Sequence, residues 1–314
     1  MNYIQQAYKG KNDAWMVILT TIIVLALFIF NILIFIFAGD DIDFAEQQKM
    51  MMDMVDSKNF WLAANLAPFL ILLGFLFLLV KYLHNRSILS LTTARKKVDW
   101  SRSAFSFFLI VIITLITFAI GYYLDPSLIE LNFNPTKFAI LLIISLILFP
   151  FQIGFEEYVF RGYLMQQIGI LVKNRWFPLL VTSLIFGIFH SANPEVAEMG
   201  SIVMVFYIGT GLLLGIMTLM DDGLELALGF HFGNNLLAAI LISADWSALQ
   251  TDAVFRYTGT ESVSAVSDII LPILIVYPLI LLVLAKKYKW TNWKEKLFGK
   301  ISPPPELIEN ETSI

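Results

Sequence analysis

Two adjacent carboxylates and an arginine lie at the end of a long apolar stretch of the sequence. Glu156, Glu157 and Arg161 occur in "GFEEYVFRG", directly after "FAILLIISLILFPFQI". A charge at the centre of a bilayer costs about 2.5–3.5 kcal/mol on insertion scales, so such residues are usually paired or functional. In a helix, Arg161 follows Glu157 by one turn on the same face, whereas it lies about 140° around the helix from Glu156. We therefore predict a Glu157–Arg161 ion pair and a Glu156 side chain without a local partner.

Two histidines and an asparagine supply the other polar groups of the later apolar segments. His190 ends "FGIFH", and "HFGNN" runs from His231 to Asn235. His231 and Asn235 are four residues apart and share a helix face, where two donors could hold an oxyanion in a dry site. The third histidine, His84, lies in a basic loop after the second apolar segment and is expected to be solvated.

These groups are suited to the hydrolysis of a peptide bond. Glu156, aided by His190, would take a proton from a water molecule that attacks a peptide carbonyl. His231 and Asn235 would then stabilise the negative oxygen that develops, an effect worth about 3–4 kcal/mol per donor in comparable oxyanion holes. The mechanism requires that side chains from separate helices meet around one cavity that water can enter.

The composition identifies the elements that must position these groups. The chain has 314 residues, of which 58% are hydrophobic and 15% are charged, whereas a soluble domain has about 25% charged residues. We therefore predict an all-α, polytopic helical membrane protein whose surroundings are the lipid bilayer, with no nucleic-acid partner. Because the chain has no cysteine, disulfides, thiolate metal sites and a cysteine nucleophile are excluded.

A transmembrane helix needs about 20 mostly apolar residues. The sequence predicts about eight such spans, at 14–38, 60–83, 104–124, 137–158, 177–192, 200–220, 224–243 and 267–285. The apolar character of the fourth span continues to about Val172. Gly211 and Gly215 are four residues apart, as are Gly229 and Gly233, and small residues at this spacing let transmembrane helices approach closely. We therefore expect the sixth and seventh spans to pack tightly against their neighbours.

The charges of the loops alternate along the chain. Basic residues gather near the N-terminus, in the loop after the second span, near 173–175 and in the C-terminal tail, whereas the first loop is acidic. By the positive-inside rule both termini are expected in the cytoplasm. The chain is expected to divide into N-terminal transmembrane helices at 1–136, a core with the motifs at 137–243, and a loop, last transmembrane helix and cytoplasmic tail at 244–314.

The three motifs together resemble those of the CPBP family, which comprises CAAX proteases and bacteriocin-processing (Abi) proteins. They are Glu-Glu-x-x-x-Arg at 156–161, Phe-x-x-x-His at 186–190 and His-x-x-x-Asn at 231–235. They occur in this order, each near a different apolar segment, in a chain with three histidines. The resemblance covers about residues 137–243 and implies an intramembrane endopeptidase.

The resemblance assigns a role to each polar residue of the motifs. Glu156 and His190 would activate water. His231 and Asn235 would form the oxyanion hole. Glu157 and Arg161 would support the site.

The family is often described as metalloproteases. Zinc in proteins usually takes three or more protein ligands, which in this chain would be Glu156, His190 and His231. The same residues also support a metal-free, glutamate-type enzyme with fewer assumptions. We therefore expect no cofactor, with zinc as the alternative that the sequence leaves open.

The partners that the resemblance implies are membrane-associated proteins or peptides, including prenylated ones. The expected location is a bacterial inner membrane, which the protein crosses several times. Two other classes of function stay open, because intramembrane Glu, Arg and His residues also serve proton relays. One is a transporter or proton-coupled carrier, and the other is a non-catalytic scaffold or immunity protein that only binds another membrane protein.

Overall fold

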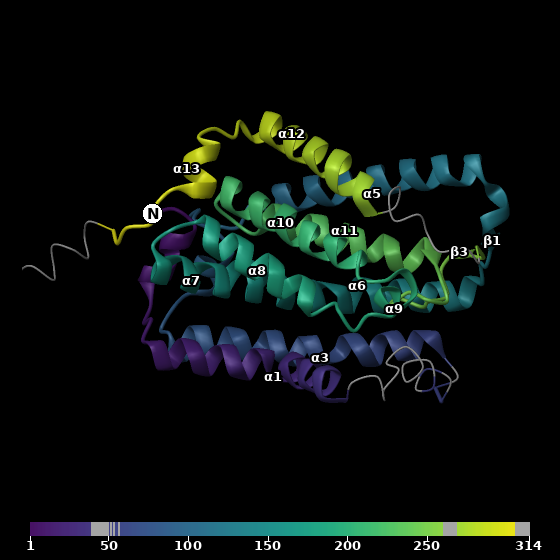
Figure 1. Ribbon diagram of the computed structural model, residues 1–314, viewed down its shortest axis with the longest axis horizontal. Helices are drawn as coiled ribbons and strands as arrows, with labels where there is room; N and C mark the ends of the chain where they lie inside the picture. Colours follow the sequence, from purple (N-terminus) through teal and green to yellow (C-terminus); the bar gives the residue numbers. More distant parts are fainter. Residues whose placement is uncertain (39–49, 51, 53, 56, 260–268, 305–314) are drawn as a thin grey trace, which may run out of the picture.

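Helices form most of the structure, a computed structural model shown in Figure 1. It describes residues 1–38, 50, 52, 54–55, 57–259 and 269–304. The acidic residues of the first loop, on which the predicted orientation partly rests, lie outside the described residues. So do the first two residues of the eighth predicted span. The helical architecture expected from the composition is present in the described part of the chain.

Five helices of the described chain are long and apolar enough to cross a membrane. They are α1 (Ala14–Ala38), α3 (Lys58–Leu78) with η3 (Leu79–Leu83), α5 (Trp100–Leu124), α6 (Pro135–Glu157) with η5 (Tyr158–Leu164) and α7 (Met165–Val172), and α10 (Val203–Asp221). Shorter helices occupy the other predicted spans, namely α8 (Trp176–Ile188), α11 (Glu225–Ile240), and α12 (Tyr277–Tyr288) after η7 (Pro272–Val276). The exact number of spans and the orientation of the termini stay predictions.

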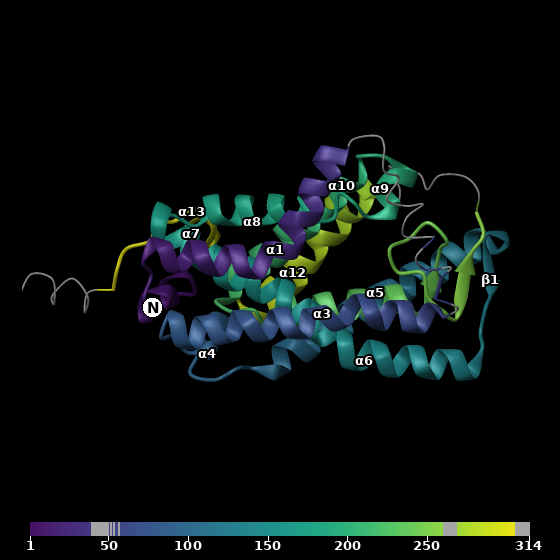
Figure 2. The same cartoon turned by 90° about the horizontal axis from the view of Figure 1, so that it is seen from below.

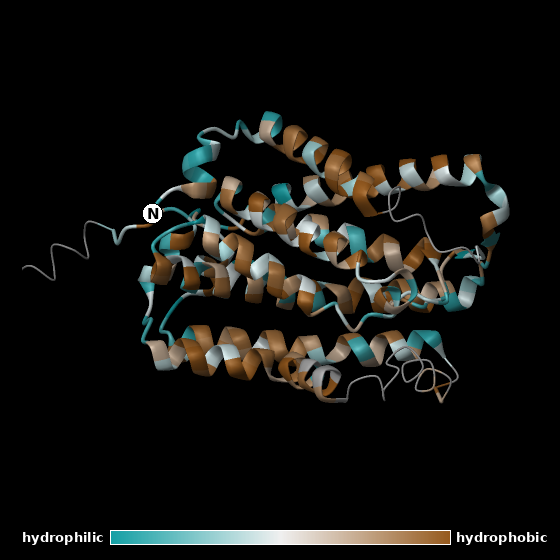
Figure 3. Cartoon of the chain, in the orientation of Figure 1, coloured by the Kyte–Doolittle hydropathy of each residue, from teal (hydrophilic) through white to brown (hydrophobic). Residues whose placement is uncertain are grey.

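Large apolar side chains cover the outside of these helices. Phe37 is 82% exposed and Leu124 is 74% exposed, and many other leucine, isoleucine and phenylalanine residues lie on the same surface. Figure 3 shows apolar residues along much of the length of the helices and hydrophilic ones concentrated towards their ends. Contiguous apolar surface on this scale is not found on soluble monomers. Together with the long apolar helices, it identifies an integral membrane protein.

The helices are arranged around the continuous helix formed by α6, η5 and α7. α3 and α11 pack against α6, α8 packs against η5 and α7, and α10 packs against α8 and reaches η5. α1 and α3 lie side by side along one side of the molecule, at the bottom of Figure 1. In Figure 2, α6 extends towards the end of the molecule that carries β1. Every helix with a predicted site residue therefore contacts this continuous helix.

The continuous helix has well-defined ends and is unusually long. The Asn134 side chain caps its first turn by accepting from the Lys137 backbone N–H, and Pro135 occupies the first turn. It ends where Lys173 adopts a left-handed conformation, with φ of 58°. Its 38 residues correspond to about 57 Å at 1.5 Å per residue, whereas the hydrocarbon core of a bilayer is about 30 Å thick. The predicted continuation of the fourth span to Val172 is thus confirmed, and Glu156 lies near the middle of the helix.

Two glycine pairs allow close approach between helices, as predicted from their spacing. A Cβ atom on Gly229 would lie 2.0 Å from the carbonyl oxygen of Ser103 on α5. A Cβ atom on Gly211 would lie 2.9 Å from Cα of Ser183 on α8. Both distances are below any real Cβ contact, so α5 and α11, and likewise α8 and α10, pack with their backbones almost touching.

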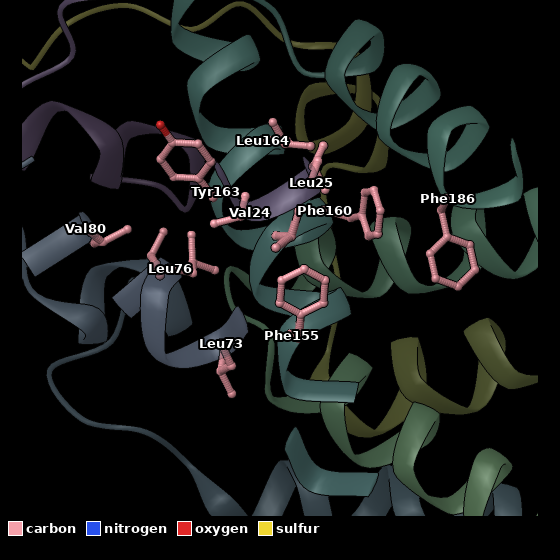
Figure 4. Close-up of a cluster of buried hydrophobic side chains, with 12 residues drawn as sticks. Val24, Leu25, Leu73, Leu76, Val80, Phe155, Phe160, Tyr163, Leu164 and Phe186 are labelled. Carbon is pink, nitrogen blue, oxygen red and sulfur yellow. The ribbon is translucent and has the colours of Figure 1, made fainter. Parts of the chain in front are cut away.

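An apolar core lies beside the centre of the continuous helix. Phe155 and Phe160 belong to this core together with Leu73 and Leu76 of α3 and Val24 of α1. Figure 4 shows these side chains gathered between the α1–α3 pair and the continuous helix. Because the residues on both sides of Glu156 and Glu157 in the sequence are committed to this core, the two carboxylates are directed towards other helices.

A small β-sheet lies at the end of the molecule opposite the N-terminus (Figure 1). β1 pairs with β3 in antiparallel register, with Glu130 opposite Arg256, and β2 pairs with β3 in parallel. The short elements at this end are η4 (Pro126–Leu128), β1 (Ile129–Leu131), α9 (Pro194–Met199), β2 (Ile242–Ser243) and β3 (Phe255–Tyr257). The described residues are mostly helical, as predicted, and the small sheet was not predicted because strands of two or three residues have no detectable periodicity.

Ion pairs join the loops at the end of the molecule that carries the N-terminus. Arg95 Nη2 lies 2.8 Å from Asp221 Oδ2 at the end of α10. The neighbouring Asp222 accepts from the Tyr3 backbone N–H at 3.1 Å and from Lys296. The short helices here are η1 (Ile4–Lys9), α4 (Ile88–Thr92) and α13 (Trp293–Phe298). Segments from the beginning, middle and end of the chain are therefore fixed together at this basic end.

His84 is buried, so the expectation that it is solvated is wrong. Its side chain is 1% exposed, and its Nδ1 donates to the Lys11 carbonyl oxygen at 2.7 Å. Its Nε2 lies 3.0 Å from both Thr20 Oγ1 on α1 and the Tyr163 hydroxyl on η5. The basic loop folds inward at this point because His84 supplies hydrogen bonds to three separate segments.

We predict that Gly229→Ala destabilises the protein whereas Gly121→Ala does not. A Cβ at Gly229 overlaps the Ser103 carbonyl, and overpacking of this kind costs about 1–3 kcal/mol. At Gly121, also in a helix, a Cβ has no neighbour within 4 Å, so the substitution should be neutral or stabilising by up to about 1 kcal/mol. Thermal unfolding of both variants in the same detergent tests this. A raised melting temperature for Gly229→Ala would contradict the packing described above.

Candidate active site

A buried carboxylate joins two other charged or polar groups at the centre of the molecule. Arg161 Nη1 donates to Glu157 Oε1 at 2.9 Å, and His231 Nδ1 on α11 donates to the same oxygen at 2.8 Å. The side chains of Glu157 and Arg161 have no exposed surface. The predicted Glu157–Arg161 pair is thus confirmed, with His231 as a third member that the spacing did not predict.

Arg161 has contacts on two further helices. Its Nη2 donates to the Gly211 carbonyl oxygen on α10 at 3.3 Å. Its guanidinium lies 4.3 Å from the ring centroid of Phe186 on α8, a cation–π contact that partly compensates for lost solvation. The arginine therefore connects η5, α8 and α10 around the buried carboxylate.

The local geometry of the chain changes between the two halves of this pair. Glu157 is the last residue of α6, and Arg161 lies within η5, which is a π-helical segment. π-helical segments are rare, and they are often found at functional sites. The wider turn changes the angular relation between residues before and after it, so a regular helical wheel describes this site only up to Glu157.

Glu156 lies beside the buried pair and is 7% exposed. Its Oε1 accepts from Gln152 Nε2, and its Oε2 lies 3.6 Å from His231 Nε2. Oε2 itself is buried without a hydrogen-bond partner. The expectation that Glu156 lacks a local partner is wrong, because the Gln152 side chain, one helical turn earlier, reaches it.

Gln152 also connects Glu156 to the asparagine of the third motif. Asn235 Nδ2 donates to Gln152 Oε1 at 3.2 Å, and Asn234 Nδ2 donates to Asn235 Oδ1 at 3.2 Å. A glutamine amide has both a donor and an acceptor, so one side chain on α6 can join the carboxylate to α11. The first and third motifs are therefore linked by a continuous chain of hydrogen bonds.

His190 lies in the turn after α8, where two aromatic rings contact it. Its Nδ1 donates to the Phe186 carbonyl oxygen at 2.7 Å. The Tyr207 ring on α10 stacks on the imidazole, with a centroid distance of 4.3 Å and an interplanar angle of 25°, and the Phe186 ring lies 4.6 Å away. With the Nδ1 proton engaged, the neutral ring has its lone pair on Nε2.

A pocket of about 70 Å³ lies between α8, α10 and α11. A cavity of this volume with polar groups in its wall can hold a few water molecules. The lining residues are Phe186, His190, Phe206, Tyr207, Thr210, Leu214, Phe230, His231, Asn234 and Asn235. Both histidines and the asparagine of the predicted site thus share one cavity.

Five of the six predicted site residues form one connected network, and His190 lies outside it. Glu156, Glu157, Arg161, His231 and Asn235 form one network of hydrogen bonds and ion contacts, with Gln152 between two of its members. His190 shares the pocket wall with part of this network. Among the hydrogen bonds of the described residues, none joins His190 to Glu156. A substrate or water would therefore be needed to connect the His190 imidazole with the Glu156 carboxylate.

A second polar network, which was not identified from the sequence, lies behind Tyr207. The Tyr207 hydroxyl donates to Glu195 Oε1 at 2.8 Å and accepts from Asn193 Nδ2 at 2.9 Å. Glu195 Oε2 accepts from the Ala248 backbone N–H at 3.0 Å. Burial raises the pKa of Glu195 above its ordinary value. The only sequence signal was the position of Asn193 and Glu195 directly after the His190 motif.

The donor set fits a metal ion poorly. In the part of the chain that the structure describes, no three His, Asp or Glu side chains are grouped so that they could hold one. A catalytic zinc site needs about three protein ligands converging on one point. We therefore derive no step through a metal ion.

The fold and the site together define a class of membrane protein. Residues 135–237 match the family model described as "Type II CAAX prenyl endopeptidase Rce1-like". The matched segment contains the continuous helix, the pocket and the residues of all three motifs. The resemblance to the CPBP family of intramembrane proteases is therefore confirmed.

A comparison with curated proteins also identifies a similar protein. The uncharacterized protein YyaK of Bacillus subtilis (strain 168) is 26% identical to this chain over 252 residues. The alignment covers 77% of this chain and 83% of that protein. No solved structure matches this chain significantly. The aligned 252 residues exceed the length of the matched segment 135–237, so the similarity to YyaK extends beyond that segment.

We predict that Arg161→Met strongly destabilises the protein. The substitution leaves the buried Glu157 carboxylate with His231 alone, and removing one partner of a buried pair costs about 3–5 kcal/mol. The double variant Glu157→Gln/Arg161→Met removes both charges and should recover part of this loss. Thermal unfolding of the two variants and of Glu157→Gln gives the coupling free energy between the residues. If the single and double variants were equally destabilised, the buried charge would not be the cause.

Proposed function

We propose that this protein is an intramembrane endopeptidase of the CPBP type, which hydrolyses a peptide bond in a membrane-associated protein or peptide. The observation that carries the proposal is the CAAX-protease family match, because residues 135–237 contain both the buried Glu156–Glu157 cluster and the pocket beside it. A buried carboxylate with one oxygen that lacks a hydrogen-bond partner is costly inside apolar helices. Water activation gives this arrangement a chemical purpose.

In the proposed reaction, a water molecule binds in the pocket between Glu156 and His190. Glu156 Oε2, which has no hydrogen-bond partner in the protein, takes a proton from this water. The water oxygen bonds to the carbonyl carbon of the peptide, and the electron pair of the C=O double bond moves to its oxygen. The proton then passes from Glu156 to the peptide nitrogen, the C–N bond breaks, and an amine and a carboxylic acid leave.

His190 contributes by orienting the attacking water. Because its Nδ1 proton is held by the Phe186 carbonyl, its Nε2 is the nitrogen that can accept a hydrogen bond from water. General acid–base groups act only within hydrogen-bond reach of the proton they move. The proposed position of the water therefore bridges the gap between the first and second motifs.

His231 and Asn235 are the proposed donors for the negative oxygen. Asn235 uses one amide hydrogen for Gln152 and has a second one available. In its protonated form, His231 donates through Nδ1 to Glu157 and through Nε2 towards the reaction. Preorganised donors of this kind are worth about 3–4 kcal/mol each in other oxyanion holes.

Glu157 and Arg161 support the site without touching the substrate. Glu157 fixes the His231 ring through Nδ1, and Arg161 balances the charge of Glu157. A ring held in one orientation preserves the geometry that catalysis needs, because a displacement of about 1 Å can cost about 100-fold in rate. This role explains why an ion pair with no exposed surface lies next to the pocket.

The proposed surroundings are a bacterial inner membrane with both termini in the cytoplasm. Support comes from the apolar outer surface and from the basic residues near the N-terminus and α13, which lie at one end of the molecule (Figure 1). Prenylated CAAX peptides are the proposed substrate class, on the basis of the printed description of the matched family. A lipid-modified peptide would partition into the bilayer and reach the pocket from there.

We predict that Glu156→Gln abolishes cleavage with little effect on folding. The amide cannot take a proton from water, and general-base catalysis contributes about 10²–10⁴-fold, so turnover should fall at least about 100-fold. The measurement is cleavage of a farnesylated CAAX peptide in proteoliposomes, followed by mass spectrometry of the products. Comparison of new peptide termini in membranes of cells with wild type and Glu156→Gln extends the test to other substrates.

Glu130→Gln is the matched control, because Glu130 is exposed on β1 at the far end of the molecule. It should cleave like the wild type. Wild-type turnover by Glu156→Gln would reject the assignment of Glu156 as the base. Proton or solute flux without any cleavage would instead support a transporter, and a co-purifying membrane protein without flux or cleavage would support a scaffold.

A further inference from the structure

Tyr207, whose ring stacks on His190, lies outside all three motifs. His190 is in a turn after α8, where its backbone N–H donates to the Gly187 carbonyl oxygen at 2.8 Å and contacts of its side chain orient the ring. These contacts are the hydrogen bond to the Phe186 carbonyl, the Phe186 ring at 4.6 Å and the stacked Tyr207 ring at 4.3 Å. Stacked aromatic pairs contribute about 0.5–1.5 kcal/mol beyond the area they bury.

Tyr207 is itself fixed at its far end. Its hydroxyl donates to Glu195 and accepts from Asn193, so both hydrogen-bonding functions of the phenol are used. Glu195 is fixed in turn by the Ala248 backbone N–H in the loop between β2 and β3. A ring that is held at its Cα by α10 and at its oxygen by α9 has little freedom to turn.

The route from Ala248 to His190 connects four segments of the chain. It begins in the loop after β2, passes through Glu195 on α9 and Tyr207 on α10, and ends on the imidazole ring that lines the pocket. Each step is a direct contact. The hydrogen bonds from Tyr207 and Ala248 account for the partly buried Glu195 carboxylate at the start of a six-residue helix.

We propose that Tyr207 is a positioning residue for His190 in peptide hydrolysis, and that Glu195 holds Tyr207 in the orientation this requires. The inference rests on the proposed function, because it assigns a partner to the histidine that orients water. Tyr207 should therefore affect both the order of the His190 imidazole in the resting protein and the rate of turnover. These can be tested independently.

The first test uses nuclear magnetic resonance of the imidazole nitrogens in detergent-solubilised protein labelled with ¹⁵N-histidine. The chain has three histidines, so the His190 signals can be assigned from a His190→Gln variant. The wild type should show the Nδ1–H form of His190 with a single ordered environment. Tyr207→Leu should shift or broaden the His190 signals while the His84 signals stay unchanged. Unchanged His190 signals in Tyr207→Leu would overturn the proposal.

The second test is cleavage of the farnesylated CAAX peptide in proteoliposomes. Tyr207→Leu removes the ring and should lower kcat at least about tenfold with KM within about twofold, because ground-state binding does not involve the stack. Tyr207→Phe keeps the ring and loses only the hydroxyl, so kcat should fall about threefold. This partial recovery by phenylalanine distinguishes ring positioning from loss of folding, as does the melting temperature of each variant.

Glu195→Ala should reproduce the effect of Tyr207→Phe, because both break the same hydrogen bond. The double variant Tyr207→Phe/Glu195→Ala should then be no worse than either single variant, whereas independent effects would multiply. Glu198→Ala is the matched control, since Glu198 is exposed on the same short helix. Tyr277→Phe is a second control that removes a hydroxyl bonded to Thr210 without touching His190.

The outcomes separate failure of this inference from failure of the proposed function. Changed His190 signals in Tyr207→Leu together with full activity of Glu156→Gln would leave the contact intact and reject the hydrolytic mechanism. Loss of activity in Glu156→Gln together with wild-type kcat and unchanged His190 signals in Tyr207→Leu would reject only the positioning role. Multiplying effects in the double variant would reject the role of Glu195.

Discussion

The structure of the site depends on one buried carboxylate. Glu157 accepts hydrogen bonds from Arg161 on its own helix and from His231 on α11, with no exposed surface on the acid or the arginine. Burial of an ion costs several kcal/mol, so each partner is tolerated only while the others are in place. Through Arg161 the same cluster reaches the Gly211 carbonyl on α10. One charge thus fixes the mutual positions of three helices and the orientation of a ring in the pocket wall.

The sequence was sufficient for those parts of the site that follow from spacing within one helix. The Glu157–Arg161 pair was predicted from a separation of one turn, and the glycine spacing predicted that α10 and α11 approach other helices closely, without identifying those helices. Both features depend only on helix geometry, which a run of apolar residues already specifies. The long continuous helix was likewise indicated by apolar character that persists to Val172.

Contacts between distant segments could not be predicted in this way. Gln152 was not identified from the sequence, and Asn235 becomes its partner only when α6 lies against α11. His84 looked like a loop residue, although Thr20 and Tyr163 come from helices far away in the sequence. The Tyr207–Glu195 contact and the small sheet have the same origin. In each case the relevant partner is chosen by tertiary packing, about which local periodicity contains no information.

Gly211 combines two requirements at one residue. Its missing side chain lets α10 approach Ser183 of α8, and its carbonyl oxygen accepts from Arg161. A larger residue there would push α10 outward and withdraw that oxygen from the guanidinium at the same time. Helix spacing and charge solvation therefore cannot be adjusted separately at this position, so any engineering of the pocket width from α10 would also alter the electrostatics beneath it.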